Sequence, residues 1–111
     1  FPKFIRNNSG KLNMKEDTIE YRRVSAVITG RVQGVYYRES TRRRALKIGG
    51  LTGWVKNQPD NTVKLIVEGN REEVQQLLDW CQSGPPMARV QSIDIVEENY
   101  INEFTDFIVR Y

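Results

Sequence analysis

The order in which strand-like and helix-like segments follow one another constrains this chain more than any other feature. Short apolar runs are typical of buried strands, and apolar residues at three- and four-residue spacing are typical of helices that pack on a sheet. The order here is strand, helix, strand, strand, helix, strand, with one more strand at the end. We expect strands over residues 24–29, 51–57, 62–68, 89–97 and 105–110, and helices over residues 37–48 and from Asn70 to the Gly84-Pro85-Pro86 stop.

Side-chain periodicity predicts which face of each segment is buried. In the first helix the inner positions are Tyr37, Thr41, Ala45 and Ile48, and in the second they are Val74, Leu77, Leu78 and Cys81. In the strands they are Val63, Leu65, Val67, Ile93 and Ile95. Asn70 and Glu73 have capping-box spacing. Residues 58–61 indicate a turn in which Asn61 tolerates a left-handed conformation.

This order of elements predicts an α+β, ferredoxin-like split βαβ sandwich. Both helices pack on one face of a mainly antiparallel sheet, and a short fifth strand is added. The first two strands should run parallel through a right-handed crossover, so that their carboxyl ends lie at the same edge. That geometry brings Asn57, which closes the second strand, toward the loop that follows the first.

Composition narrows the class of protein. The chain has 111 residues, a formal net charge of +3 and one cysteine, Cys81, so an internal disulfide framework is excluded. No apolar run approaches the roughly 20 residues that span a bilayer. All the excess positive charge lies in residues 1–13, which contain three cations and no acid, and the remainder is balanced. We therefore expect a monomeric, cytoplasmic protein that binds neither nucleic acid nor membrane.

The first residues lack any periodicity. We expect residues 1–20 to be a mobile extension that is partly derived from cloning, with Met14 as the natural start, and residues 21–111 to form the domain. A processed native tail is the alternative for residues 1–13.

The stretch from Gly30 to Arg38 predicts an anion site. Two glycines four residues apart allow a tight loop whose peptide N–H groups turn inward, and the start of a helix adds further free N–H groups. Phosphate is the natural occupant. The expected backbone donors are Val32, Gln33, Gly34, Val35, Tyr36 and Tyr37. Arg38, in the first helical turn, can lean back over the loop, where its forked guanidinium suits two phosphate oxygens.

The absence of certain residues limits the chemistry. The chain has no histidine, the loop has no cysteine, and no Gly-Lys-Ser/Thr follows it, which excludes histidine-assisted nucleophiles, a phosphocysteine and a Walker A loop. No acidic cluster near the loop offers a Mg²⁺ site. A cradle of amides, Arg38 and a candidate water-holder, Asn57, remain. Without a general acid such a site needs a leaving group that departs unprotonated, and a mixed anhydride of a carboxylic acid and phosphate provides one.

Two motifs, Gly30-Arg31-Val32-Gln33-Gly34-Val35-Tyr36-Tyr37-Arg38 and Gly53-Trp54-Val55-Lys56-Asn57, resemble those of the acylphosphatases in order, spacing and context. The resemblance covers about residues 22–111. It implies the fold derived above and hydrolysis of acyl phosphates to a carboxylate and inorganic phosphate without metal or cofactor. It also implies that Arg38 binds phosphate and that Asn57 orients the attacking water, whose proton passes to the substrate's own phosphate. Asn61 departs from the glycine usual in the family.

Less specific interpretations stay open for single residues. The two glycines alone fit an ordinary turn, and Arg38 alone fits a surface arginine. Tyr36 and Tyr37 are expected to pack, and Trp54 to pack in the core or at the edge of the site. Ferredoxin-like domains also include RNA-binding sheets, but the third strand here has no aromatic residue. A catalytically inert domain that only binds phosphate compounds is a further alternative, and turnover distinguishes it from the enzyme.

Overall fold

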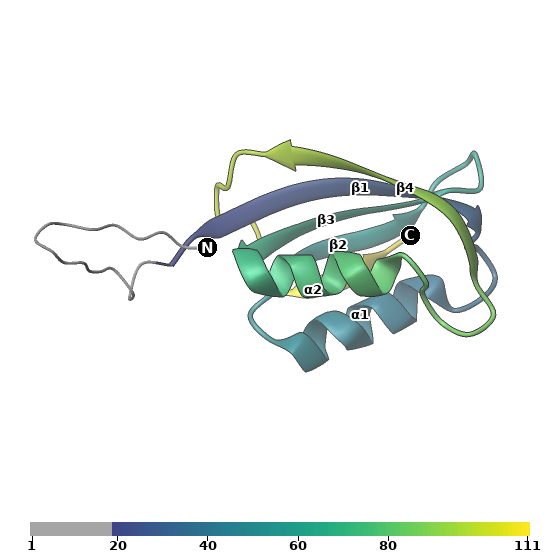
Figure 1. The fold of residues 1–111 in the computed structure, drawn as a ribbon, viewed down its shortest axis with the longest axis horizontal. Helices are drawn as coiled ribbons and strands as arrows, with labels where there is room; N and C mark the ends of the chain where they lie inside the picture. Colours follow the sequence, from purple (N-terminus) through teal and green to yellow (C-terminus); the bar gives the residue numbers. More distant parts are fainter. Residues whose placement is uncertain (1–18) are drawn as a thin grey trace, which may run out of the picture.

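A five-stranded sheet with both helices on one face forms the structure (Figure 1), a computed structural model that describes residues 19–111. The strands are β1 (Tyr21–Arg31), β2 (Thr52–Asn57), β3 (Val63–Asn70), β4 (Arg89–Glu98) and β5 (Phe107–Arg110), and the helices are α1 (Tyr37–Ile48) and α2 (Arg71–Cys81). Most of the expected extension over residues 1–20, including Met14, lies outside the described residues.

The strand order in the sheet is β4-β1-β3-β2-β5. β3 is antiparallel to both β1 and β2, so these two run in the same direction on either side of it. Their carboxyl ends therefore meet at one edge of the sheet, as the split βαβ order predicted. β5 joins β2 in parallel, with Lys56 paired to Arg110, and brings a third carboxyl end to that edge.

Most of the predicted inner positions are buried in the core between sheet and helices. The stripe on α2 and the inner residues of β3 are fully buried, and on α1 Ile48 is only half-buried against the core. Removing such side chains from water contributes about 1.5–3 kcal/mol each for the larger aliphatic ones. The buried members are Val63, Leu65, Val67, Val74, Leu77, Leu78, Cys81, Tyr37, Thr41 and Ala45.

Several strand limits differ from those predicted. β1 begins at Tyr21, which pairs with Asn70, and both strands continue past their apolar runs. Ladder hydrogen bonds join backbone groups and do not require apolar side chains, so hydropathy alone placed the start of β1 too late and the end of β3 too early. The last strand, in contrast, begins two residues later than expected, at Phe107. The expectation for Ile95 was wrong. It is 39% exposed, because β4 is an edge strand with a neighbour on one side only.

The expectations for turns and helix ends agree better with the structure. Asn61 adopts φ 73°, as the turn predicted. The side chain of Asn70 caps α2 by accepting the backbone N–H of Glu72 at 3.0 Å, so the helix itself starts one residue later than expected. Gly49 follows the end of α1.

A buried carboxylate fixes the segment between β4 and β5. Glu68, 1% exposed, accepts hydrogen bonds from the backbone N–H groups of Ile101 at 2.9 Å, Asn102 at 3.1 Å and Glu103 at 2.8 Å. Arg23 adds a further contact at 3.3 Å. These contacts tie the connection between β4 and β5 to β3. The chain then continues into β5, which lies beside β2.

Candidate active site

The loop between β1 and α1 has two left-handed residues in alternate positions. Gly34 adopts φ 73° and Tyr36 φ 64°. Val32 and Val35 are buried at 1% and 3% exposure and anchor the loop to the core. The loop so anchored lies beside the carboxyl end of β2, where Val32, Gly34 and Tyr36 line the same cavity as Asn57.

The peptide N–H groups of this loop are free. Within the described residues, none of the backbone N–H groups of residues 33–38 donates a hydrogen bond, and the first bond of α1 runs from Ser40 N–H to Tyr36 O at 3.0 Å. No side chain caps the helix. A cluster of unpaired N–H groups at a helix start is a binding site for an anion.

Gly30 serves the sheet and not the loop, contrary to the sequence interpretation. It lies within β1 at a bulge opposite β4, with φ 131°. A Cβ atom there would lie 2.1 Å from the carbonyl oxygen of Arg89. Glycine is needed here because the backbone of β4 approaches closely, and of the two glycines only Gly34 lies in the loop, where it adopts a left-handed conformation.

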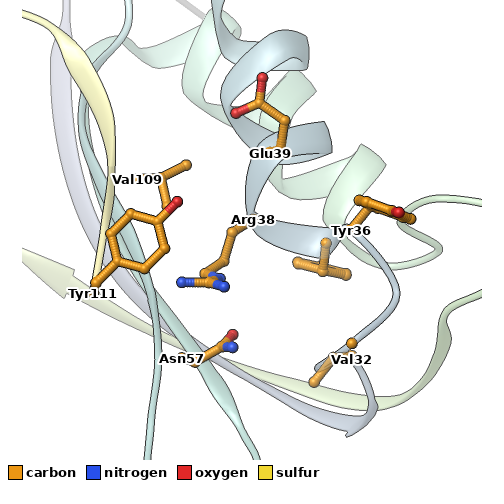
Figure 2. Close-up of a pocket in the computed structure, with 9 residues that line it drawn as sticks. Val32, Tyr36, Arg38, Glu39, Asn57, Val109 and Tyr111 are labelled. Carbon is orange, nitrogen blue, oxygen red and sulfur yellow. The ribbon is translucent and has the colours of Figure 1, made fainter.

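Arg38 extends from the first turn of α1 between Asn57 and Tyr111 (Figure 2). Its Nη1 donates to the carbonyl oxygen of Arg110 at 3.3 Å, and its guanidinium lies 4.7 Å from the centre of the Tyr111 ring. It forms no ion pair with an acidic side chain in the part of the chain that the structure describes. Its positive charge is therefore available to an anionic ligand.

Asn57 ends β2 on the same side of the sheet as the buried Val55. Its Oδ1 atom is buried and accepts no hydrogen bond. A buried acceptor without a partner costs about 1–3 kcal/mol, so such atoms mark places where a ligand or water is expected. Beside it lies a cavity of about 420 Å³ (Figure 2), lined by Val32, Gly34, Tyr36, Tyr37, Arg38, Glu39, Asn57, Val109 and Tyr111.

Glu39 is the acidic residue that lines this cavity, and its carboxylate points away from Arg38 and Asn57 (Figure 2). Hydrogen bonds from Arg42, at 2.7 and 2.9 Å, and from Arg43, at 3.1 Å, lower its pKa to about 2. Glu39 is thus ionised at neutral pH and has no proton to give a leaving group. Among the described residues no group of acidic, histidine or cysteine side chains is arranged to hold a metal ion.

Comparison with known proteins identifies the family to which the chain belongs. The profile of the family described as Acylphosphatase matches residues 24–109. The chain belongs to the acylphosphatase family. A relative named acylphosphatase from Methylococcus capsulatus is 51% identical over 88 residues, which cover 79% of this chain and 95% of the relative. The family that the two motifs resemble is thereby confirmed, and acyl phosphate hydrolysis with it.

Solved acylphosphatases share the fold. The structure from Coxiella burnetii has a TM-score of 0.75 at 37% identity and covers 81% of this chain and 93% of that one. The structure from Bacillus subtilis has a TM-score of 0.77 at 30% identity and covers 81% of this chain and 99% of that one. The ferredoxin-like sandwich predicted from the order of elements is therefore confirmed. Neither described helix is long and apolar enough to cross a membrane.

The acylphosphatase cavity contains most, but not all, of the predicted site residues. Val32, Gly34, Tyr36, Tyr37, Arg38 and Asn57 line it. The side chain of Val35 is part of the core, and that of Gln33 turns toward the β2–β3 turn. The expectation that Tyr36 packs was wrong, because its left-handed backbone turns the ring outward and leaves it 81% exposed. Tyr37 packs as expected, at 2% exposure.

Three residues of the cavity were missed, Glu39, which directly follows Arg38, and Val109 and Tyr111 at the end of the chain. The sequence predicted a fifth strand but not its neighbour. Parallel pairing of β5 with β2 places Tyr111 close to Asn57, and this pairing depends on tertiary contacts such as those of Glu68. The signal present in the sequence was the short apolar run of residues 107–109.

Proposed function

We propose that this acylphosphatase binds the phosphoryl group of its substrate in the free amides of residues 33–38 and against Arg38. The amides and the guanidinium provide donors in fixed positions, which stabilise charge that develops on phosphate oxygens without reorganisation during the reaction. The unpaired N–H groups and the absence of an ion pair at Arg38 within the described residues support this assignment.

Asn57 orients the attacking water through Oδ1. This buried, unpartnered oxygen beside Arg38 is the single observation that most supports the mechanism. Holding a water molecule in line with the scissile bond converts a bimolecular step into one with a high effective concentration. The water oxygen forms a bond to phosphorus, the bond from phosphorus to the acyl oxygen breaks, and its electron pair leaves with the carboxylate. The water proton passes to a phosphate oxygen.

No metal ion, cofactor or general acid takes part in this scheme. The carboxylate leaving group needs no proton, which suits a site whose acidic neighbour, Glu39, is held ionised by two arginines. Inorganic phosphate, the product, competes for the same amides. The protein acts as a monomer in the cytoplasm.

Hydrolysis of benzoyl phosphate, measured with and without a chelator, tests the proposal. We expect turnover that EDTA does not reduce and competitive inhibition by inorganic phosphate. Replacing Arg38 with alanine should lower kcat/KM about 100- to 1000-fold with the fold intact. Arg44→Ala on the same helix is the matched control, because Arg44 lies over Trp80 and not in the cavity. Loss of activity on chelation, or a fully active Arg38→Ala, contradicts the mechanism.

A further inference from the structure

The side chain of Gln33 crosses from the phosphate loop to the turn between β2 and β3. Its Nε2 atom donates two hydrogen bonds, to the carbonyl oxygens of Gln58 and Thr62, each at 2.8 Å. Both partners are acceptors only, so the NH₂ group of the amide must face them. One side chain thus joins the middle of the loop to the residue that directly follows Asn57.

The turn that receives these bonds is braced internally. Gln58 N–H donates to Thr62 O at 2.8 Å, and Asn61 N–H donates to Gln58 O at 3.1 Å. The Asp60 carboxylate accepts from the backbone N–H and the hydroxyl of Thr62, at 3.1 and 2.6 Å. Because the turn is closed by its own hydrogen bonds, a displacement at its two carbonyl ends is passed to the end of β2 and so to Asn57.

Without this side chain, the connection between loop and Asn57 is indirect. β1 and β2 are not neighbours, because β3 lies between them. The loop leaves β1 at Arg31, and Asn57 is the last residue of β2, so each is at the free end of its strand. Gln33 bridges these ends across the width of β3.

We propose that Gln33 is a positioning residue, which sets the separation between the phosphate loop and the water-orienting oxygen of Asn57. This inference rests on the proposed function. The phosphorus atom is held by the loop and the water by Asn57, so their separation is the distance along which the new bond forms. Misplacement by about 1 Å costs roughly 100-fold in rate when reacting atoms must meet in line.

Two variants and a matched control test this role. Gln33→Met keeps the length of the side chain but has no donor, and Gln33→Asn keeps the amide but is one methylene too short to reach both carbonyls. Gln76→Met, on the exposed face of α2, is the control. With benzoyl phosphate we expect kcat to fall about 10- to 100-fold in both Gln33 variants. The Kd for inorganic phosphate, measured by calorimetry, should stay at the wild-type value, because the amides and Arg38 are retained.

A second measurement separates positioning from general destabilisation. Combined with Asn57→Ala, Gln33→Met should cause no further loss of kcat, because Gln33 acts through Asn57. Wild-type kcat in a folded Gln33→Asn or Gln33→Met protein, or full additivity with Asn57→Ala, overturns the inference. So does a loss of phosphate binding equal to the loss of kcat. If Gln33→Met does not fold, Gln33→Asn is measured in its place.

Failure of the inference is distinguishable from failure of the proposed function. Active wild-type protein with an inactive Arg38→Ala, together with a fully active Gln33→Asn, removes only the role of Gln33. A wild-type protein that binds phosphate without hydrolysing benzoyl phosphate removes the proposed function itself.

Discussion

The guanidinium of Arg38 rests on the ring of Tyr111, 4.7 Å from its centre, while Nη1 donates to the neighbouring carbonyl of Arg110 at 3.3 Å. The last residue of β5 and the residue that follows it therefore hold the side chain of Arg38 in the cavity. Stacking occupies one face of the guanidinium and leaves its N–H edge for hydrogen bonds. The long bond to Arg110 is easily exchanged for one to a phosphate oxygen.

Removing the Tyr111 ring should weaken phosphate binding modestly. In Tyr111→Ala the guanidinium loses a contact worth about 0.5–1 kcal/mol at an exposed site, so we expect Kd for inorganic phosphate to rise about two- to fivefold. Tyr111→Phe retains the ring and should bind as the wild type does. Calorimetric titration with phosphate measures both, and a phenylalanine variant as weak as the alanine variant would show that the hydroxyl matters instead.

Asn57→Ala should separate activity from stability. We expect kcat for benzoyl phosphate to fall about 100-fold or more, because the water loses its acceptor. The free energy of unfolding should stay within about 1 kcal/mol of the wild type or exceed it, since a buried unsatisfied oxygen is removed.

Asn70→Ala is the matched comparison, with the opposite expectation. Its Oδ1 caps α2 at 3.0 Å from the N–H of Glu72, so we expect a loss of about 1 kcal/mol of stability and full activity. Urea unfolding measures the stability of the two variants, and steady-state kinetics measures their activity. Equal effects of the two substitutions on kcat would contradict the assignment of Asn57.

Alanine should be tolerated at Gly34 but not at Gly30. At Gly34 no atom lies within 4 Å of the added Cβ, so the cost is that of a left-handed alanine, about 1–2 kcal/mol. At Gly30 the Cβ would lie 2.1 Å from Arg89 O and 2.8 Å from Gln91 N, which forces β1 and β4 apart and should cost about 3 kcal/mol or more. Urea midpoints rank the two, and similar midpoints would refute the distinction.

The protein should lose stability in acid, because protonation removes the stabilising contribution of ionised Glu68. Burial by itself would raise the pKa of this carboxyl, but the backbone N–H groups of Ile101 and Glu103 and the guanidinium of Arg23 outweigh it, and the pKa is lowered. A carboxyl with a lowered folded pKa contributes stability above its unfolded pKa, near about 4.3, and this stability is lost as pH falls through the folded value.

Glu68→Gln measures that contribution. At pH 7 the amide cannot serve all these donors, and we expect a loss on the order of 2 kcal/mol. The difference between wild type and variant should shrink as the pH is lowered below about 4. Asp94→Asn, exposed on the edge strand β4, is the control and should change little. A difference that is constant from pH 7 to pH 3 would exclude ionised Glu68 as its source.

Much of this architecture is contained in local patterns. The apolar stripe of Val74, Leu77, Leu78 and Cys81 predicted α2 correctly, because apolar residues at this spacing lie on one face of a helix but not on one face of a strand. The crossover rule predicts that Asn57 lies near the loop that carries Arg38, and the two residues do line one cavity. Such features follow from residues near in sequence or from general rules of chain connection.

Other features depend on contacts that no local pattern reveals. The sequence pattern places Gly30 in the loop. The close approach of the Arg89 carbonyl oxygen, which requires glycine at this position, arises only when β4 pairs with β1. Tyr111 lines the cavity only because β5 pairs with β2. The amide of Gln33 finds two carbonyls that are 25 and 29 residues away. Each of these is a tertiary relationship between segments distant in the chain.

Among the neighbouring strands of the described sheet, only β2 and β3 follow one another in sequence. Every other pairing must close a long loop before it gains its hydrogen bonds, and such topologies fold slowly. The cavity needs β1, β2 and β5 in place together, so a sheet that lacks any of these three strands cannot assemble it. Hydrolysis of an acyl phosphate during refolding should therefore appear only after β1, β2 and β5 have all joined the sheet, so activity itself reports that these strands have paired.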